Sequence, residues 1–157
     1  MITCKFENGG DGALRHAVVH ALAVKDGKIL LVKRSEKIID GGRWAFPGGF
    51  INRDETAQQA VLRELMEETG WDGRVKTLFR VNSNPHRPRD EERQNIPLEF
   101  IVEPIQKTGE PDGEQTAVEW IELVAVDEDE MAFNHGITLS LLKQYLKGEI
   151  PLPVTTM

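Results

Sequence analysis

The chain has 157 residues, a mass of 17.7 kDa and a formal net charge of −7. This is the size of one domain, and we expect residues 1–157 to form a single domain. Hydrophobic residues make up 39% and charged residues 29% of the chain, a balance that excludes an intrinsically disordered protein. The excess of acidic over basic residues argues against a nucleic-acid partner, because such binding requires a basic face.

The first residues, 1–12, end in a glycine-rich run from Asn8 to Gly12 and are expected to be a flexible lead-in. They lack the basic stretch and apolar core of a secretory signal. The longest apolar stretches, such as Ala17–Val24, fall short of the roughly 20 residues that span a bilayer. The lone Cys4 excludes an intrachain disulfide and a cysteine-rich zinc site. These features predict a cytoplasmic protein with no membrane partner.

The segment after the lead-in predicts a β-hairpin. Ala17–Val24 is apolar and β-branched, Asp26 and Gly27 supply turn chemistry, and Ile29–Val32 resumes the apolar pattern. A polar loop over residues 35–43 follows the hairpin. Next comes the rigid turn Pro47-Gly48-Gly49, where missing side chains let backbone groups approach a ligand.

Residues 56–69 predict the central helix, since they contain no Gly or Pro and Gly70 follows as a stop. Thr56 and Gln59 fit a capping box at its start. The helical period separates an apolar from an acidic side. The two sides consist of Val61, Leu62, Leu65 and Met66, and of Glu64, Glu67 and Glu68.

The second half of the chain predicts strands and one late helix. The strands are expected at Val75–Val81, Leu98–Val102 and Val118–Ile121, and the amphipathic helix at Ile137–Leu146. A long loop spans residues 82–97, and His135 is expected in a loop. Strands that surround one central helix and a late one favour an α+β fold or a mixed α/β sandwich over regular βαβ repeats.

Three carboxylates within one helical turn have two interpretations. Glu64, Glu67 and Glu68 repel one another, and a solvated acidic face is the common fate of such a cluster. The alternative is a site for Mg²⁺ or Mn²⁺, which are hard cations that take oxygen ligands. Without a cation, the repulsion raises at least one carboxyl pKa, and perturbed pKa values are typical of functional sites.

The surrounding residues favour the cation site. The run from Gly49 to Trp71 resembles the signature of the Nudix hydrolases at every fixed position: Gly49, Glu55, Arg63, Glu64, Leu65, Glu67, Glu68, Gly70 and Trp71. Nudix hydrolases cleave a diphosphate linked to a nucleoside and to a second group, using a divalent metal and water. The resemblance implies their α+β fold, an α/β/α sandwich with a mixed β-sheet and the signature as a loop–helix–loop motif.

The resemblance also implies roles within the signature. The metal would be ligated by the helix acids and by one backbone carbonyl of the glycine pair: Glu64, Glu67, Glu68, and Gly48 or Gly49. Glu55 and Arg63 resemble supporting residues, because an arginine can pair with a carboxylate through two parallel hydrogen bonds and hold the loop on the helix. The alternative for Arg63 is a solvated helix residue.

Further candidates lie outside the signature. Arg34, thirteen residues before Pro47, resembles a phosphate-contacting arginine of the nucleoside-triphosphatase branch; the alternative is an exposed cation at a strand end. Glu114, six residues before Trp120, resembles the acid that serves as general base or extra metal ligand, with Glu91 and Glu92 as second candidates. The alternative for each acid is a solvated loop residue.

The substrate is indicated by the loop after residue 81. Pro85, fifteen residues after Gly70, resembles a marker of the ADP-ribose pyrophosphatase branch. Arg87 and Arg89 would meet a phosphate or terminal ribose, or would pair with nearby acids. We therefore expect hydrolysis of ADP-ribose, or of a related nucleoside diphosphate-linked small molecule, to AMP and a sugar phosphate.

Two other functions are open at this point. A house-cleaning (d)NTP pyrophosphohydrolase is favoured by Arg34 and Glu114. A non-catalytic sensor of ADP-ribose is disfavoured, because such proteins commonly lose signature acids and here none is lost. The resemblance is compatible with a homodimer.

Overall fold

The structure, a computed structural model, describes residues 2–86 and 95–154. Its main sheet has seven strands in the order β5-β4-β3-β8-β7, with β6 paired to β3 and β9 paired to β4. The strands are β3 (Ala17–Lys25), β4 (Lys28–Lys33), β5 (Trp44–Ala45), β6 (Gly48–Phe50), β7 (Trp71–Val81), β8 (Ile96–Lys107) and β9 (Ala117–Glu122). The helices are α1 (Ala57–Thr69), the 3-10 turn η1 (Glu128–Glu130) and α2 (His135–Leu146).

The sheet is mixed, as expected. β3 runs parallel to β8 and antiparallel to β4 and β6, while β7 runs antiparallel to β8. Asp26 and Gly27 form the β3–β4 turn with φ of 51° and 76°, the two positive values that favour Asp-Gly in a tight hairpin.

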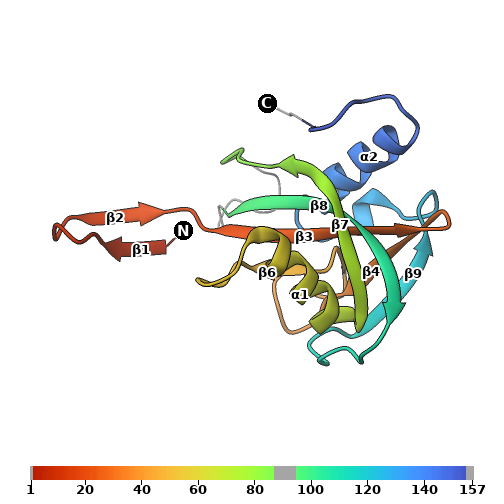
Figure 1. Ribbon diagram of the computed structural model, residues 1–157, viewed down its shortest axis with the longest axis horizontal. Coiled ribbons are helices and arrows are strands. Elements are labelled where there is room, and N and C mark those ends of the chain that lie inside the picture. Colours follow the sequence, from red (N-terminus) through yellow and green to blue (C-terminus); the bar gives the residue numbers. More distant parts are fainter. Residues whose placement is uncertain (1, 87–94, 155–157) are drawn as a thin grey trace.

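Each face of the sheet is covered by one helix. Val61 and Leu65 of α1 pack in the same cluster as Ala21 of β3, whereas Leu139 of α2 packs in a second cluster with Leu22 of the same strand. Neighbouring residues of a strand point to opposite faces, so β3 contributes to both cores. Figure 1 shows α1 and α2 on opposite sides of the strands. The expected α/β/α sandwich is confirmed.

The local signals for α1 are confirmed in detail. Thr56 Oγ1 accepts a hydrogen bond from the Gln59 N–H at 3.2 Å, and the Thr56 N–H donates to Gln59 Oε1 at 2.8 Å. Gly70 ends the helix in the left-handed region, with φ 73°, and its N–H donates to the Met66 carbonyl at 2.8 Å. These caps fix where the signature helix begins and ends.

The amino-terminal segment differs from the expected flexible lead-in. β1 (Ile2–Lys5) pairs antiparallel with β2 (Asp11–Leu14), and this hairpin extends away from the main sheet (Figure 1). Gly9 has φ 84°, and the Phe6 N–H donates to the Gly10 carbonyl at 2.8 Å, so the glycine-rich run forms a turn.

Several elements exceed their expected bounds, and β7 begins at Trp71 instead of Val75. His135, expected in a loop, is the first residue of α2. β8 extends across Pro97 and Pro104, which the sequence pattern does not assign to a strand. Pro104 lies at a register shift of the β7–β8 pair, where a residue without an N–H is tolerated. In the described part of the chain, neither helix is long and apolar enough to cross a membrane.

Candidate active site

A cavity of about 720 Å³ lies beside α1, between β3, β6 and the loop that precedes β9. It brings together residues that the sequence places far apart. Eight of the predicted site residues line it: Arg34, Gly48, Gly49, Arg63, Glu64, Glu67, Glu68 and Glu114. The acidic side of α1 therefore lines an open cavity, with Glu64 and Glu68 partly buried and Glu67 exposed.

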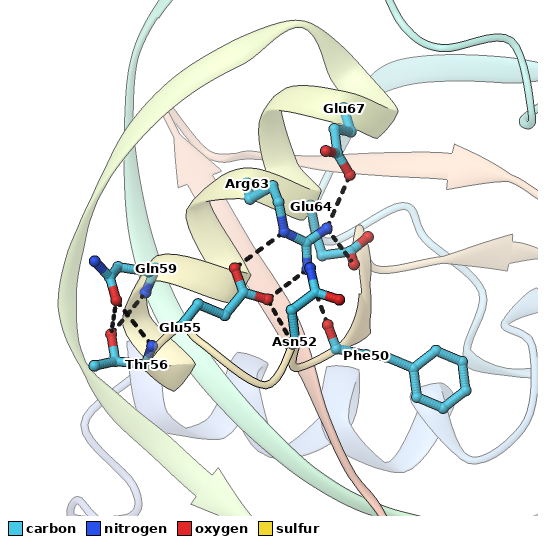
Figure 2. Close-up of polar contacts among 8 residues, drawn as sticks. All are labelled: Phe50, Asn52, Glu55, Thr56, Gln59, Arg63, Glu64 and Glu67. Carbon is cyan, nitrogen blue, oxygen red and sulfur yellow. Dashed lines mark hydrogen bonds and ion pairs between the residues drawn. The ribbon is translucent and has the colours of Figure 1, made fainter.

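Arg63 is the centre of a carboxylate network (Figure 2). Its Nε and Nη2 donate to the two oxygens of Glu55 at 3.1 and 2.7 Å. Its Nη1 donates to Glu64 Oε1 at 2.8 Å and to Glu67 Oε2 at 2.9 Å, and Nη2 also reaches the Phe50 carbonyl at 3.0 Å. The guanidinium thus joins the loop before α1 to the helix, and its hydrogen bonds lower the pKa of Glu55.

Glu68 is held on both of its oxygens. The backbone N–H of Gly48 donates to Oε2 at 2.9 Å, and Gln115 Nε2 donates to Oε1 at 2.5 Å. Burial is the largest influence on this carboxyl, followed in the same direction by the charges of Glu64 and Asp112, and together they raise its pKa to about 8. Glu64 also has a raised pKa, chiefly because of burial.

Gly48 and Gly49, expected in a turn, lie in strand β6 and leave no room for side chains. A Cβ on Gly49 would lie 2.5–2.7 Å from the carboxylate of Glu64, and a Cβ on Gly48 would collide with the Val19 carbonyl. The close approach of β6 to α1 and to β3 therefore depends on glycine at both positions.

The carboxylate oxygens on the cavity wall are the kind of ligand that a hard divalent cation prefers. Glu64, Glu67 and Glu68 all offer carboxylate oxygens to one cavity, and the charged form of Glu68, disfavoured first by burial and then by nearby acids, would be stabilised by a cation. Within residues 2–86 and 95–154, however, no three His, Cys, Asp or Glu side chains converge as a ready-made metal site. Instead, Arg63 holds Glu64 and Glu67, while Gly48 and Gln115 hold Glu68.

The predicted residues outside the signature divide into three groups. Arg34 lines the cavity, with its guanidinium 4.6 Å from the centre of the Phe133 ring and its Nε donating to the Ile39 carbonyl at 3.1 Å. Glu114 lines the cavity but is exposed. Pro85 is exposed and is not among the described residues of the cavity wall. The last four predicted residues lie outside the described part of the chain: Arg87, Arg89, Glu91 and Glu92.

The cavity also contains residues that the sequence did not single out. Gln115 contacts Glu68 directly, next in the chain to the predicted Glu114. His20 of β3 and His135 of α2 lie with ring centres 4.4 Å apart, and His135 Nδ1 accepts a hydrogen bond from the Phe46 N–H at 3.3 Å. None of these contacts carries a local sequence signal, because each joins separate elements of the fold.

Comparison with known proteins gives one family. The model of the NUDIX domain matches residues 13–142. The ADP-ribose pyrophosphatase of Methanocaldococcus jannaschii is 34% identical over 129 residues, covering 82% of this chain and 72% of that protein.

Solved structures agree on the fold. The crystal structure of a NUDIX hydrolase from Nitrosomonas europaea has a TM-score of 0.72 and 21% identity, covering 93% of this chain and 85% of that one. The NUDIX domain of Shewanella oneidensis NrtR, solved in complex with ADP ribose, has a TM-score of 0.71 and 25% identity. That match covers 86% of this chain and 90% of the NrtR chain.

Proposed function

This chain belongs to the NUDIX family, and from that premise we propose that it hydrolyses the diphosphate linkage of ADP-ribose or a related nucleoside diphosphate derivative. The products are AMP and a sugar phosphate, and the reaction requires Mg²⁺ or Mn²⁺. The observation that carries the proposal is the set of signature acids Glu64, Glu67 and Glu68 on the wall of one cavity of about 720 Å³. The function of the M. jannaschii relative and the ligand of the NrtR structure support ADP-ribose as the first substrate to test.

The residues that would hold the cations are the helix acids and one carbonyl of the glycine pair: Glu64, Glu67, Glu68, and Gly48 or Gly49. When bound, the cations neutralise the bridging phosphates and lower the pKa of the attacking water. Arg63 donates to one oxygen of Glu64 and to one oxygen of Glu67. Each of the two carboxylates therefore keeps a second oxygen that can ligate a cation. Glu55 keeps Arg63 oriented through two hydrogen bonds, one to each of its oxygens.

The outer part of the cavity would bind the remainder of the substrate. Arg34 supplies a cation near the Phe133 ring for a substrate phosphate. We still predict that Pro85, Arg87 and Arg89 contact the terminal ribose or its phosphate. Glu114 lines the cavity as an exposed acid and is the proposed general base or additional cation ligand.

A direct assay tests this function. Purified protein is incubated with ADP-ribose and MgCl₂, and the products are separated by chromatography with a parallel sample in EDTA. We expect AMP and ribose phosphate to appear only with the cation. The absence of turnover for ADP-ribose and for the related nucleoside diphosphate sugars would overturn the proposal.

One alternative substrate class rests on a specific observation. Arg34, which lines the same cavity as the acids of α1, has the spacing that resembles the phosphate-contacting arginine of the nucleoside-triphosphatase branch. Comparing ADP-ribose with dNTPs in one assay separates the two classes. A higher kcat/KM for a dNTP would make the protein a (d)NTP pyrophosphohydrolase.

A further inference from the structure

The loop between β8 and β9 is fastened to the helix that carries the acids. The Gly109 N–H donates to the Gly70 carbonyl at 3.1 Å, and the Asp112 N–H donates to the Glu67 carbonyl at 2.8 Å. At its other end, the N–H and Oγ1 of Thr116 both donate to the Lys33 carbonyl, at 2.9 and 3.2 Å. Residue 115 is therefore held between an anchor on α1 and an anchor on β4.

Gln115 uses this placement to reach Glu68. Its Nε2 donates to Glu68 Oε1 at 2.5 Å, while the Gly48 N–H holds Oε2. The acceptor fixes the orientation of the amide, because a rotated amide would set its oxygen against a carboxylate oxygen. Gln115 Oε1 is buried and accepts no hydrogen bond from the described residues, so the bond to Glu68 is the one described hydrogen bond of the amide.

The neighbouring loop residues do not share this contact. Glu114 is exposed, and its N–H donates to Asp112 Oδ1 at 3.0 Å, a turn within the loop. Asp112 adds negative charge near Glu68, which disfavours the charged carboxylate. Among the described side chains, Gln115 is the one that donates a hydrogen bond to Glu68 and so favours its ligand form.

We infer that Gln115 is a positioning residue, which holds the carboxylate of Glu68 in the orientation that binds a divalent cation. The inference rests on the proposed role of Glu68 as a cation ligand. Hydrogen-bond donors behind a ligating carboxylate set its direction, and their loss typically costs 10–100-fold in metal affinity or activity. The Gly48 N–H fixes only one oxygen, so without Gln115 the carboxylate can rotate about that bond.

The test compares Gln115→Met, which keeps the length of the side chain but removes the donor, with Thr116→Val as a matched control. Thr116→Val removes the next side-chain hydrogen bond of the same loop and leaves the backbone anchor to Lys33. Mn²⁺ affinity is measured by calorimetric titration without substrate, and kcat and KM are measured with ADP-ribose. Gln115→Asn, whose amide is too short to reach Glu68, serves as the second variant if Gln115→Met does not fold.

We expect the Gln115 variants to weaken Mn²⁺ binding about 10-fold or more and to lower kcat similarly, with KM changed by no more than about twofold. The Thr116 control should bind Mn²⁺ like the wild type. Wild-type affinity in both Gln115 variants, an equal loss in the Thr116 control, or no Mn²⁺ uptake by the wild type would overturn the inference. If Mn²⁺ binding depends on Gln115 but ADP-ribose is not cleaved, the proposed substrate fails and the role of Gln115 stands.

Discussion

The backbone N–H of Gly48 donates a 2.9 Å hydrogen bond to Glu68 Oε2, which joins the start of β6 to the last turn of α1. This donor favours the charged carboxylate, as does Gln115, yet burial outweighs them and the pKa of Glu68 is about 8. The fold therefore keeps an acid in a position where its charge is unfavourable without a counter-ion. That cost is typical of a functional site.

Glu68→Gln is expected to lower turnover of ADP-ribose by about 10²-fold or more, because the amide keeps the shape of the side chain but cannot ligate a cation as a carboxylate does. Steady-state kinetics with saturating MgCl₂ measure the effect. Glu119→Gln, which changes an exposed acid on β9 outside the cavity, is the control and should keep wild-type kcat. Near-normal activity in Glu68→Gln would remove Glu68 from the metal role.

The same substitution is expected to stabilise the protein at alkaline pH in EDTA. The pKa of Glu68 rises from 4.5 to about 8 on folding, so the folded chain keeps a proton that the unfolded chain releases. This carboxyl therefore lowers the stability of the wild type progressively between about pH 4.5 and pH 8, and Gln, which is never charged, removes that loss.

Urea unfolding of wild type and Glu68→Gln at about pH 9 and about pH 5 measures the difference. We expect Glu68→Gln to be more stable by at least about 1 kcal/mol at the higher pH, with a smaller difference at the lower pH. Equal stability of the two proteins at pH 9 in EDTA would show that burial does not raise the pKa of Glu68.

The sequence predicted those parts of the fold that have local chemical causes. Thr56, Gln59 and Gly70 set the ends of α1 through their own hydrogen bonds and φ values, and Asp26 and Gly27 do the same for the hairpin. The periodicity of α1 also placed its acids on one side. Such signals involve residues within a few positions of one another, so a single sequence contains them.

The site contacts that the sequence missed are tertiary. Gln115 meets Glu68 across 47 positions of the chain, and His20 meets His135 because β3 and α2 pack together. Glu114 has the spacing to Trp120 that resembles the family pattern, yet the neighbouring Gln115 makes the hydrogen bond to Glu68. A loop has no regular period, so spacing in the sequence does not predict which side chain points into the cavity. His135 was expected in a loop because Gly136 follows it, although tertiary packing holds both in α2.

Arg63→Lys is expected to destabilise the protein by about 1–3 kcal/mol, although the charge is kept. A single ammonium cannot reproduce the paired bonds to Glu55 together with those to Glu64 and Glu67. Urea denaturation measures the loss, and Arg53→Lys, at a mostly exposed arginine beside Asp54, is the control. If both variants unfold at the wild-type midpoint, Arg63 is no more than a solvated helix residue.

Gly49→Ala is expected to reduce activity about 10-fold or more while the fold is kept. The added Cβ meets the carboxylate of Glu64, which is the end of a flexible side chain and can turn away, and this displaces a proposed cation ligand. Kinetics and thermal unfolding are measured together. Gly10→Ala, in the β1–β2 turn and away from the cavity, is the comparison for activity, because the added Cβ would meet only the Asn8 side chain, at 3.2 Å. Full activity in Gly49→Ala would contradict a role for the position of Glu64.

The most direct test of the cation site is a crystal structure of the protein with MnCl₂ and a non-hydrolysable ADP-ribose analogue, with anomalous scattering measured for manganese. We predict anomalous peaks between the carboxylates of α1 and the analogue's diphosphate, with Glu68 among the ligands. A diphosphate bound in the cavity with no manganese beside Glu64, Glu67 or Glu68 would contradict the central claim.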